Sequence, residues 1–398
     1  MLLTGRLMEE TANFESAAII KQYKEVISFN TEWEACHFYL AKYFDKVMMA
    51  MTESESNRQS TLLTHIIFHF GRSLQFGCQF IYQSLHRMLT LWLDFSSPTN
   101  FNHGGTNAES RVIRECLMQL KGIMLDHARK LPAYQFLTAF SQLTSRICHP
   151  QPDIWVVLRT IILKVFQQYT QQAMWLLLAV SMSSHKLREE RCQDVFLKAQ
   201  HHDNRLTKLI RDLKDLNRQL LLMTNKQMSA HTLSMSRDFG TLKHLVESSS
   251  FSPVLIPLQR CMTPSLPSSP GSHLDHDPFP RHLVYIQGFK DLVEVMNSMQ
   301  KPKKFTLLGS DGSCYAIMCK PRDDLRKDFR MMEFNMLINK FLRKNAETKR
   351  RGLGIHMYAA IPLNQECGLI EWVPNTTSLR CIIGDLHTEK GECTSTVM

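Results

Sequence analysis

The chain has 398 residues, of which 44% are hydrophobic and 21% are charged, values that suit a globular protein with a sizeable core. Its longest strongly apolar stretch, residues 173–180, is far shorter than the roughly 20 residues of a membrane-spanning helix, and its start lacks a secretory pattern. We therefore expect two or three domains and no membrane partner.

The net charge of +10 allows attraction to nucleic acid or to acidic surfaces. The densest basic clusters, residues 301–304 and 349–351, carry no nucleic-acid motif, so we expect both to be solvated and leave direct DNA contact open. The 11 cysteines occur singly, without a CxxC pair or a zinc spacing, and are interpreted as reduced thiols.

The first 250 residues show helical periodicity and no strand signal. Apolar side chains recur at three- and four-residue steps within residues 33–44, 74–92, 134–143 and 154–169, which places them on one face of each helix. Helical hairpins in series predict an α-solenoid, which we assign to residues 1–180.

Residues 181–288 are expected to be a helical extension followed by a Pro/Ser-rich linker. Prolines crowd this second part, where they remove backbone donors and block helices, at Pro253, Pro257, Pro264, Pro267, Pro270, Pro278 and Pro280. A composition change of this kind is typical of a domain boundary.

Residues 289–398 predict a small α+β domain. Residues 293–296 indicate a strand, and alternation on both sides of the turn at 309–312 indicates a β-hairpin. An amphipathic helix opens at 321–324, and residues 355–363 and 368–373 predict two more strands. The fold class is therefore mainly α, with a small antiparallel sheet and one inserted helix at the end.

Three short motifs resemble functional sites but have simpler interpretations. Residues 309–312 lack the spacing of a phosphate loop and fit a hairpin turn. The tripeptide DFG at 238–240 binds metal in many kinases, yet here it precedes any ATP-binding lysine, so we interpret it as chance. His65 and His69 lie four residues apart without the glutamate of a zinc-protease motif.

Lys320 is the strongest single candidate. It ends an alternating strand and is followed by a helix that begins with acidic residues. In kinases a strand lysine reaches the ATP phosphates and a helical acid holds it in place. Many strand-end lysines are merely solvated, so the spacing alone leaves both interpretations open.

The sequence motifs around Lys320 resemble motifs of the PI3-kinase-related kinases. KPRDDLRKD at 320–328 and MEFN at 332–335 are similar to the lysine-plus-helix block of that family, and YAAIP at 358–362 and GLIEWV at 368–373 are similar to its hinge strand. Longer segments resemble the DNA-damage checkpoint members of the family, at residues 6–16, 69–77, 132–143 and 300–312. The resemblance extends over nearly the full chain.

This resemblance implies a FAT-type helical domain over residues 1–180 and a PI3K/PI4K-type kinase N-lobe over residues 289–398. At the phosphate end of bound ATP, it implies a contact from Ser298 and a contact from Lys320 to the α and β phosphates. It further implies that Asp328 holds Lys320, with Asp323 nearby.

At the adenine end the resemblance implies stacking on Trp372. The backbones of Glu371 and Val373 would hydrogen-bond the edge of the base, and Met318 and Tyr358 would line the inner pocket. Stacking and shape contribute affinity in such pockets, while polar contacts fix orientation.

The resemblance decays after Cys381. The family continues into a C-lobe with a GxxDRHxxN-type catalytic loop and a DF[GN]-type metal motif, and neither follows Val373 here. Transfer of phosphate depends on positioning and on metal electrostatics. We therefore expect no catalytic residue and no Mg²⁺ or Mn²⁺ ligand in this chain, and no activity of the chain alone.

Two main hypotheses follow. In the first, implied by the resemblance, the chain is part of a nuclear, ATP-dependent serine/threonine protein kinase of the replication-stress checkpoint. Such a kinase would phosphorylate Ser/Thr-Gln sites, form dimeric assemblies and bind an ATRIP-type partner. In the second, the chain is a non-catalytic truncated product that acts as a FAT-domain scaffold or competes with the full-length kinase. A helical adaptor unrelated to kinases is a weaker third hypothesis.

Overall fold

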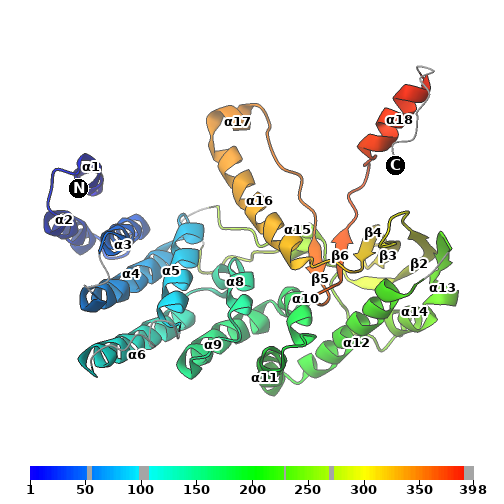
Figure 1. Cartoon of the computed structure of the whole chain (residues 1–398), viewed down its shortest axis with the longest axis horizontal. Coiled ribbons are helices and arrows are strands. Elements are labelled where there is room, and N and C mark those ends of the chain that lie inside the picture. Colours follow the sequence, from blue (N-terminus) through cyan, green and yellow to red (C-terminus); the bar gives the residue numbers. More distant parts are fainter. Residues whose placement is uncertain (52–55, 98–106, 228–229, 269–272, 390–398) are drawn as a thin grey trace.

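The computed structural model describes residues 1–51, 56–97, 107–227, 230–268 and 273–389. Within these ranges no helix combines the length and the apolar character that crossing a bilayer requires. Helices form a curved band that runs along the chain, and a small sheet lies at its far end (Figure 1).

Helices make up the described chain as far as residue 225, as expected for the solenoid. They are α1 (Leu2–Thr11), α2 (Ser16–Phe29), α3 (Glu34–Met49), α4 (Ser56–Phe76), α5 (Ile81–Phe95), α6 (Asn107–Lys130), α7 (Ala133–Leu137), α8 (Phe140–Ser145), α9 (Pro152–Gln168), α10 (Thr170–Ser181), α11 (Lys186–His202) and α12 (Arg205–Asn225). They pack on helices that are near in sequence, such as α3 on α4, α4 on α5 and α6, and α9 on α10 and α11, so the fold is a helical solenoid.

Helix α9 illustrates how the sequence specifies these elements. Pro152 stands in the first turn, where a missing N–H costs nothing, and Asp153 beside it favours the positive end of the helix dipole. One face is buried, through Ile154, Val157, Leu158, Ile161, Ile162, Val165 and Phe166. The three- and four-residue spacing of these side chains is the periodicity from which the helix is predicted.

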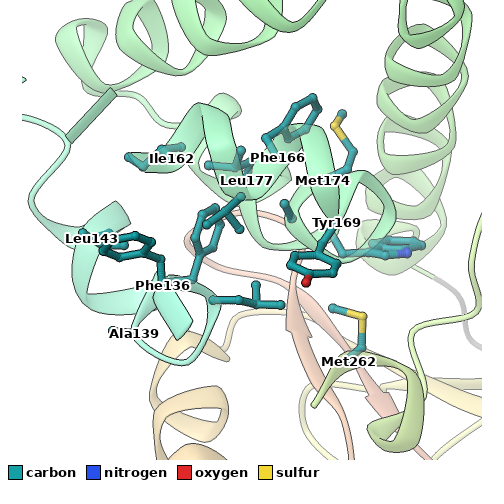
Figure 2. Close-up of a cluster of buried hydrophobic side chains, with 14 of the residues drawn as sticks. Phe136, Ala139, Leu143, Ile162, Phe166, Tyr169, Met174, Leu177 and Met262 are labelled. Atoms are coloured by element: carbon teal, nitrogen blue, oxygen red, sulfur yellow. The ribbon is translucent and has the colours of Figure 1, made fainter. Parts of the chain in front are cut away.

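The core of the helical band continues into the segment that follows it. In Figure 2, side chains of α7 and α8, such as Phe136 and Leu143, pack with Phe166 of α9 and Leu177 of α10. Met262, from the Pro/Ser-rich segment, closes this cluster. The linker therefore shares one hydrophobic core with the scaffold.

The sheet is antiparallel and has the order β1-β2-β3-β4-β6-β5. Its strands are β1 (Thr232–Ser234), β2 (Ile286–Val295), β3 (Lys303–Gly309), β4 (Cys314–Lys320), β5 (Ala360–Pro362) and β6 (Gly368–Glu371). The predicted hairpin is confirmed as β3 and β4. The remaining helices are α13 (Met235–Asp238), α14 (Gly240–Glu247), α15 (Gln259–Met262), α16 (Arg326–Lys344), α17 (Ala346–Arg350) and α18 (Leu379–Glu389).

Several local expectations were wrong. A strand, β1, lies in the part of the chain where none was expected, and it pairs with β2. The strand expected over 355–363 covers only Ala360–Pro362, and α18 was not anticipated. Residues 390–398 lie outside the described residues. The Asp238 carboxylate accepts the backbone N–H of Ser234 at 2.8 Å, so the DFG tripeptide has a structural use at α13.

The described part of the Pro/Ser-rich linker connects α10 to the sheet. The Trp175 indole N–H donates to the Leu255 carbonyl at 2.9 Å. On the other side of the segment, the Ile256 N–H donates to Val284 O at 2.9 Å, and the Ile286 N–H donates to Val254 O at 2.8 Å. The backbone groups of residues 254–256 are thus bonded to scaffold and sheet together. Strand β2 begins at Ile286, before the expected domain start at residue 289.

The two faces of the sheet differ in burial because side chains alternate along each strand. The back face is buried and packs toward α12, α14 and the linker; it carries Lys303, Phe305, Leu307, Ile317 and Cys319. Lys303 belongs to the basic cluster that was expected to be solvated. That expectation was wrong for Lys303, whose side chain is 2% exposed because its strand parity points it into the core.

Candidate functional site

The front face of the sheet collects the candidate residues from two strands. Alternation along β4 places Met318 and Lys320 on this half-exposed face. Met318 pairs with Ile370, and Lys320 pairs with Gly368 on the neighbouring strand β6. The Trp372 N–H donates to Ala316 O at 3.0 Å, which extends the pairing and places Trp372 on the same face.

Lys320 forms an ion pair with Asp323 in the turn after β4, and each side chain is about one-third exposed (32% and 34%). The Asp323 N–H donates to Glu366 O at 2.7 Å, which fixes the turn that presents this carboxylate. Asp328 lies one turn further on, at the start of α16, and the described residues show no ion pair between it and Lys320. The residue expected merely to lie nearby is the one that contacts the lysine.

Ser298 lies exposed in the loop that joins β2 to β3. Its N–H donates to Met296 O at 2.9 Å, and its carbonyl accepts the N–H of Lys301 at 3.1 Å, which makes the loop a tight turn. The Gln300 side-chain amide donates to Arg322 O at 3.4 Å. The loop of Ser298 and the turn that follows Lys320 therefore lie side by side.

The hinge strand is held through Glu371. Its N–H donates to Ala359 O at 2.8 Å, and its carboxylate accepts the N–H of Ala359 at 2.9 Å and of Gln259 at 2.7 Å. Tyr358 stands two residues before Ala360, which pairs with Ile370. Val373 follows on the half-exposed continuation of β6.

Lys304 is a front-face residue that the sequence reasoning missed. It pairs with Met318 in register, and its ammonium lies 3.3 Å from a carboxylate oxygen of Glu294. The same ammonium lies 4.9 Å from the centroid of the Trp372 ring, within the range of a cation–π contact. The signal was available, because Lys304 has the opposite strand parity to the apolar residue Phe305.

The scaffold holds the helix that follows Lys320. The Ser141 hydroxyl of α8 donates to the Glu333 carboxylate of α16, with its oxygen 2.9 and 3.0 Å from the two carboxylate oxygens. The Arg330 guanidinium donates to the same carboxylate at 2.7 Å. Burial raises the pKa of Glu333 above its usual value, and the charged Arg330 opposes this shift.

The described residues contain no group of three or more His, Cys, Asp or Glu side chains that could hold a metal ion. His37 and His69 face each other, with their Nδ1 atoms 2.9 Å apart, but they lie in the scaffold core. Burial lowers the pKa of His69 to about 3 and also lowers the pKa of His37, which favours the neutral form of both rings.

Three family models match the chain in succession. The FAT domain matches residues 1–90, the HEAT repeats described as serine/threonine-protein kinase ATR-like match residues 119–217, and phosphatidylinositol 3- and 4-kinase matches residues 314–398. The order along the chain is that of the helical band followed by the sheet.

Relatives that match nearly the whole chain indicate the same family. The chain is 34% identical to serine/threonine-protein kinase ATR of Drosophila melanogaster over 410 residues, covering 98% of this chain and 16% of the relative. It is 35% identical to protein kinase rad3 of Schizosaccharomyces pombe, and the match covers 92% of this chain and 16% of the relative. It is 31% identical to the Arabidopsis thaliana ATR, covering 94% and 15%. The chain thus spans about 16% of the length of the relatives it matches.

Solved structures share the fold. One described as the open conformation of CtTel1 has a TM-score of 0.65 at 18% identity and covers 98% of this chain and 13% of that chain. Another, of the FAT and kinase domain of CtTel1, has a TM-score of 0.62 at 19% identity and covers 96% and 24%. These likenesses confirm a FAT-type helical solenoid joined to a kinase N-lobe. The family models and the ATR and rad3 relatives show that the chain belongs to the ATR-like members of the PI3-kinase-related protein kinases.

Proposed function

We propose that this chain binds an adenine nucleotide on the front face of its sheet, as the N-lobe of a checkpoint serine/threonine protein kinase. The observation that carries the proposal is that Lys320, paired with Asp323, and Trp372 lie on one half-exposed face. A cation for phosphate and an aromatic ring for a base are the two groups that an adenine nucleotide needs.

At the phosphate end, the Lys320 ammonium would donate to the α and β phosphates, and Ser298 would add a contact from the adjacent loop. Asp323 supports this role because it holds the ammonium at the end of β4. Asp328, in the first turn of α16, remains a proposed second acid. Such charge-assisted hydrogen bonds are the strong ones in phosphate recognition.

At the adenine end, the ring of Trp372 would stack on the base, and Met318 and Tyr358 would line the inner side. The N–H of Glu371 is already donated to Ala359 O, so we assign its carbonyl to the base. The amide of Val373 would supply the complementary donor.

Divalent Mg²⁺ or Mn²⁺ neutralises phosphate charge in the reaction of this kinase family. The described residues provide no cluster of three or more His, Cys, Asp or Glu side chains that fits such an ion. We accordingly propose that these 398 residues bind nucleotide without transferring phosphate.

For the whole kinase we propose the activity that its relatives' names indicate, a serine/threonine protein kinase of the DNA-damage checkpoint. Ser/Thr-Gln substrates, an ATRIP-type partner and a nuclear location belong to the same proposal. A dimeric assembly is supported by a solved CtTel1 structure described as a dimer with C2 symmetry.

The test is nucleotide binding to the purified full chain, measured by calorimetry for Lys320→Met beside the native sequence. Loss of one charge-assisted contact to phosphate predicts an ATP affinity lower by about tenfold or more. The matched control is Lys327→Met, which removes an exposed lysine from the first turn of α16. Equal loss in both variants would show that net charge alone governs binding.

A kinase assay on the same samples, with Mg²⁺-ATP and a Ser-Gln peptide, addresses phosphate transfer. We expect no Lys320-dependent phosphorylation. Phosphorylation that disappears in Lys320→Met would contradict the proposal that this chain does not transfer phosphate by itself.

A second candidate function is a non-catalytic scaffold or competitor of the full-length kinase. The continuous core from the helical band through Met262 favours it, because this core contains none of the residues assigned to the nucleotide. A folded chain that binds no ATP, yet lowers the activity of a co-expressed full-length kinase, would support this function over the first.

A further inference from the structure

A cavity of about 240 Å³ lies behind the β2–β3 loop, where that loop meets the end of α12 and the turn after β4. Cationic residues come from all three walls: Lys226, Lys301, Lys303 and Arg322. No acidic residue lines it in the part of the chain that the structure describes. None of the residues assigned above to the nucleotide lines it either, so it is separate from the front face.

Lys303 is built into the wall of this cavity. Its side chain is 2% exposed, and its ammonium donates to Thr224 O, at the end of α12, at 2.9 Å. Among the described residues this carbonyl is its one hydrogen-bond acceptor, although an ammonium has three donors. Burial lowers the pKa of Lys303, which reflects a charge that lacks a full set of partners.

Lys226 is also held in place at the cavity. Its ammonium donates to Asp238 O at 2.9 Å and lies 5.1 Å from the centroid of the Phe239 ring. These contacts orient the ammonium, and the nearby Asp238 carboxylate, which is itself paired with Arg237, does not line the cavity. Four cationic side chains therefore line the cavity without an acidic side chain among its described lining residues.

The two loops that supply the other cations have an unusual backbone. Lys301 has φ 48° and Arg322 has φ 53°, which is the left-handed region that residues other than glycine rarely adopt. Backbone strain of this kind gathers at ligand clamps and must be held by the surroundings. Here the Gln300 amide holds it, through its contact with Arg322 O at 3.4 Å.

We propose that this cavity binds a compact, phosphate-bearing anion of diphosphate size. At roughly 30 Å³ per water in the liquid, its volume corresponds to about eight water molecules and suits a small polyanion. Ammonium and guanidinium groups that converge without a carboxylate are the donors that phosphate oxygens accept. The anion would supply the acceptors that Lys303 lacks.

Occupancy would also affect the front face, and this consequence rests on the proposed nucleotide function. The loop that carries Ser298 and the turn that carries Asp323 form walls of the cavity or adjoin them. An anion that bridges Lys301 and Arg322 would fix both segments before ATP arrives. The cavity would then act as a regulatory site for the nucleotide-binding face.

The experiment is calorimetric titration of the full chain with inorganic pyrophosphate, with sulfate at equal ionic strength as the reference anion. Arg322→Gln and Lys226→Gln are each expected to weaken pyrophosphate binding by about fivefold or more, and Arg322→Lys to restore most of it. Lys304→Gln is the matched control, because Lys304 lies in the same basic cluster but on the front face. Thermal melting checks that each variant is folded.

Lys320→Met separates this site from the nucleotide site, since it is expected to weaken ATP binding and to leave pyrophosphate binding unchanged. In that background, retained binding of pyrophosphate supports the proposal, and ADP binding that Arg322→Gln weakens further would show that the cavity also accepts a nucleotide-borne diphosphate. Absence of pyrophosphate binding to the native chain, equal binding of sulfate, or loss of pyrophosphate binding in Lys320→Met with retention in Arg322→Gln would each overturn it.

Discussion

The backbone N–H of Gln259 donates to the carboxylate of Glu371 at 2.7 Å, which fastens the first residue of α15 to the last residue of the hinge strand β6. The same carboxylate oxygen accepts the N–H of Ala359 at 2.9 Å. One side chain thus joins the linker to two neighbouring segments of the sheet. The position of the hinge strand therefore depends on its contact with Gln259 of the linker as well as on the sheet.

Replacing Glu371 by alanine should destabilise the chain. Two backbone donors would lose their acceptor, and an unsatisfied donor that is shielded from water costs about 1–3 kcal/mol. Urea unfolding would measure the change in free energy. Glu366→Ala is the matched control, because Glu366 is exposed. Equal stability of the two variants would show that water replaces the carboxylate without cost.

Alanine substitutions at Gly71 and Gly122 should change the stability of the fold in opposite directions. A Cβ at Gly71 of α4 would lie 2.0 Å from Nε2 of the buried His127, so Gly71→Ala is expected to destabilise by about 1–3 kcal/mol. A Cβ at Gly122 of α6 meets nothing within 4 Å, so Gly122→Ala is expected to stabilise by about 0.5–1 kcal/mol. Thermal or urea unfolding of both variants tests the pair, and changes of the same sign would contradict it.

His127 should make stability fall in mild acid. Burial lowers the pKa of His127 to about 4 from the ordinary 6.5, so the unfolded chain binds this proton more readily than the folded chain. Its contribution is therefore constant above pH 6.5 and is lost as the pH falls toward 4. At pH 5 the loss is about 2 kcal/mol for this group alone.

The check on His127 is the slope of unfolding free energy against pH between 7 and 5. His127→Gln is expected to flatten this slope relative to the native chain, whatever its effect at pH 7. His202→Gln is the control, because His202 is exposed. A slope unchanged in His127→Gln would count against the buried neutral form.

Asp323 and Asp328 should differ in their effect on nucleotide binding. Lys320 pairs with Asp323, and the pair is partly exposed, so Asp323→Asn is expected to weaken ATP binding by up to about fivefold. Asp328→Asn removes the same charge from the next turn and serves as the control. A larger effect of Asp328→Asn would mean that nucleotide binding moves Lys320 to the partner that the family resemblance implies.

The isolated segment 289–398 should be unstable. A cut at residue 289 passes through β2 and removes β1, α12, α14 and the linker, which cover the back face of the sheet. Side chains such as Phe305 and Ile317 would then be exposed, and an apolar face of this kind favours aggregation. Size-exclusion chromatography and melting would test this. A monomeric segment that melts cooperatively would contradict it.

Local patterns predicted the elements that carry their own signal. The apolar spacing of α9 and the alternation of β3 and β4 around residues 309–312 depend only on neighbours along the chain, so they are legible in the sequence. The same alternation placed Lys320 at the end of its strand, and the motifs that resemble the kinase family identified Trp372 as a candidate residue. These are properties of period and spacing, which one strand or one helix already determines.

Other features depended on which segments meet in space. Lys303 and Lys304 are adjacent in the sequence, yet one is buried against Thr224 and the other lies over Trp372. The sequence determined that successive strand residues face opposite sides. Only the tertiary structure decided which side is covered, because burial depends on the packing of α12 and the linker against the sheet. The local sequence of the basic cluster does not indicate that long-range contact.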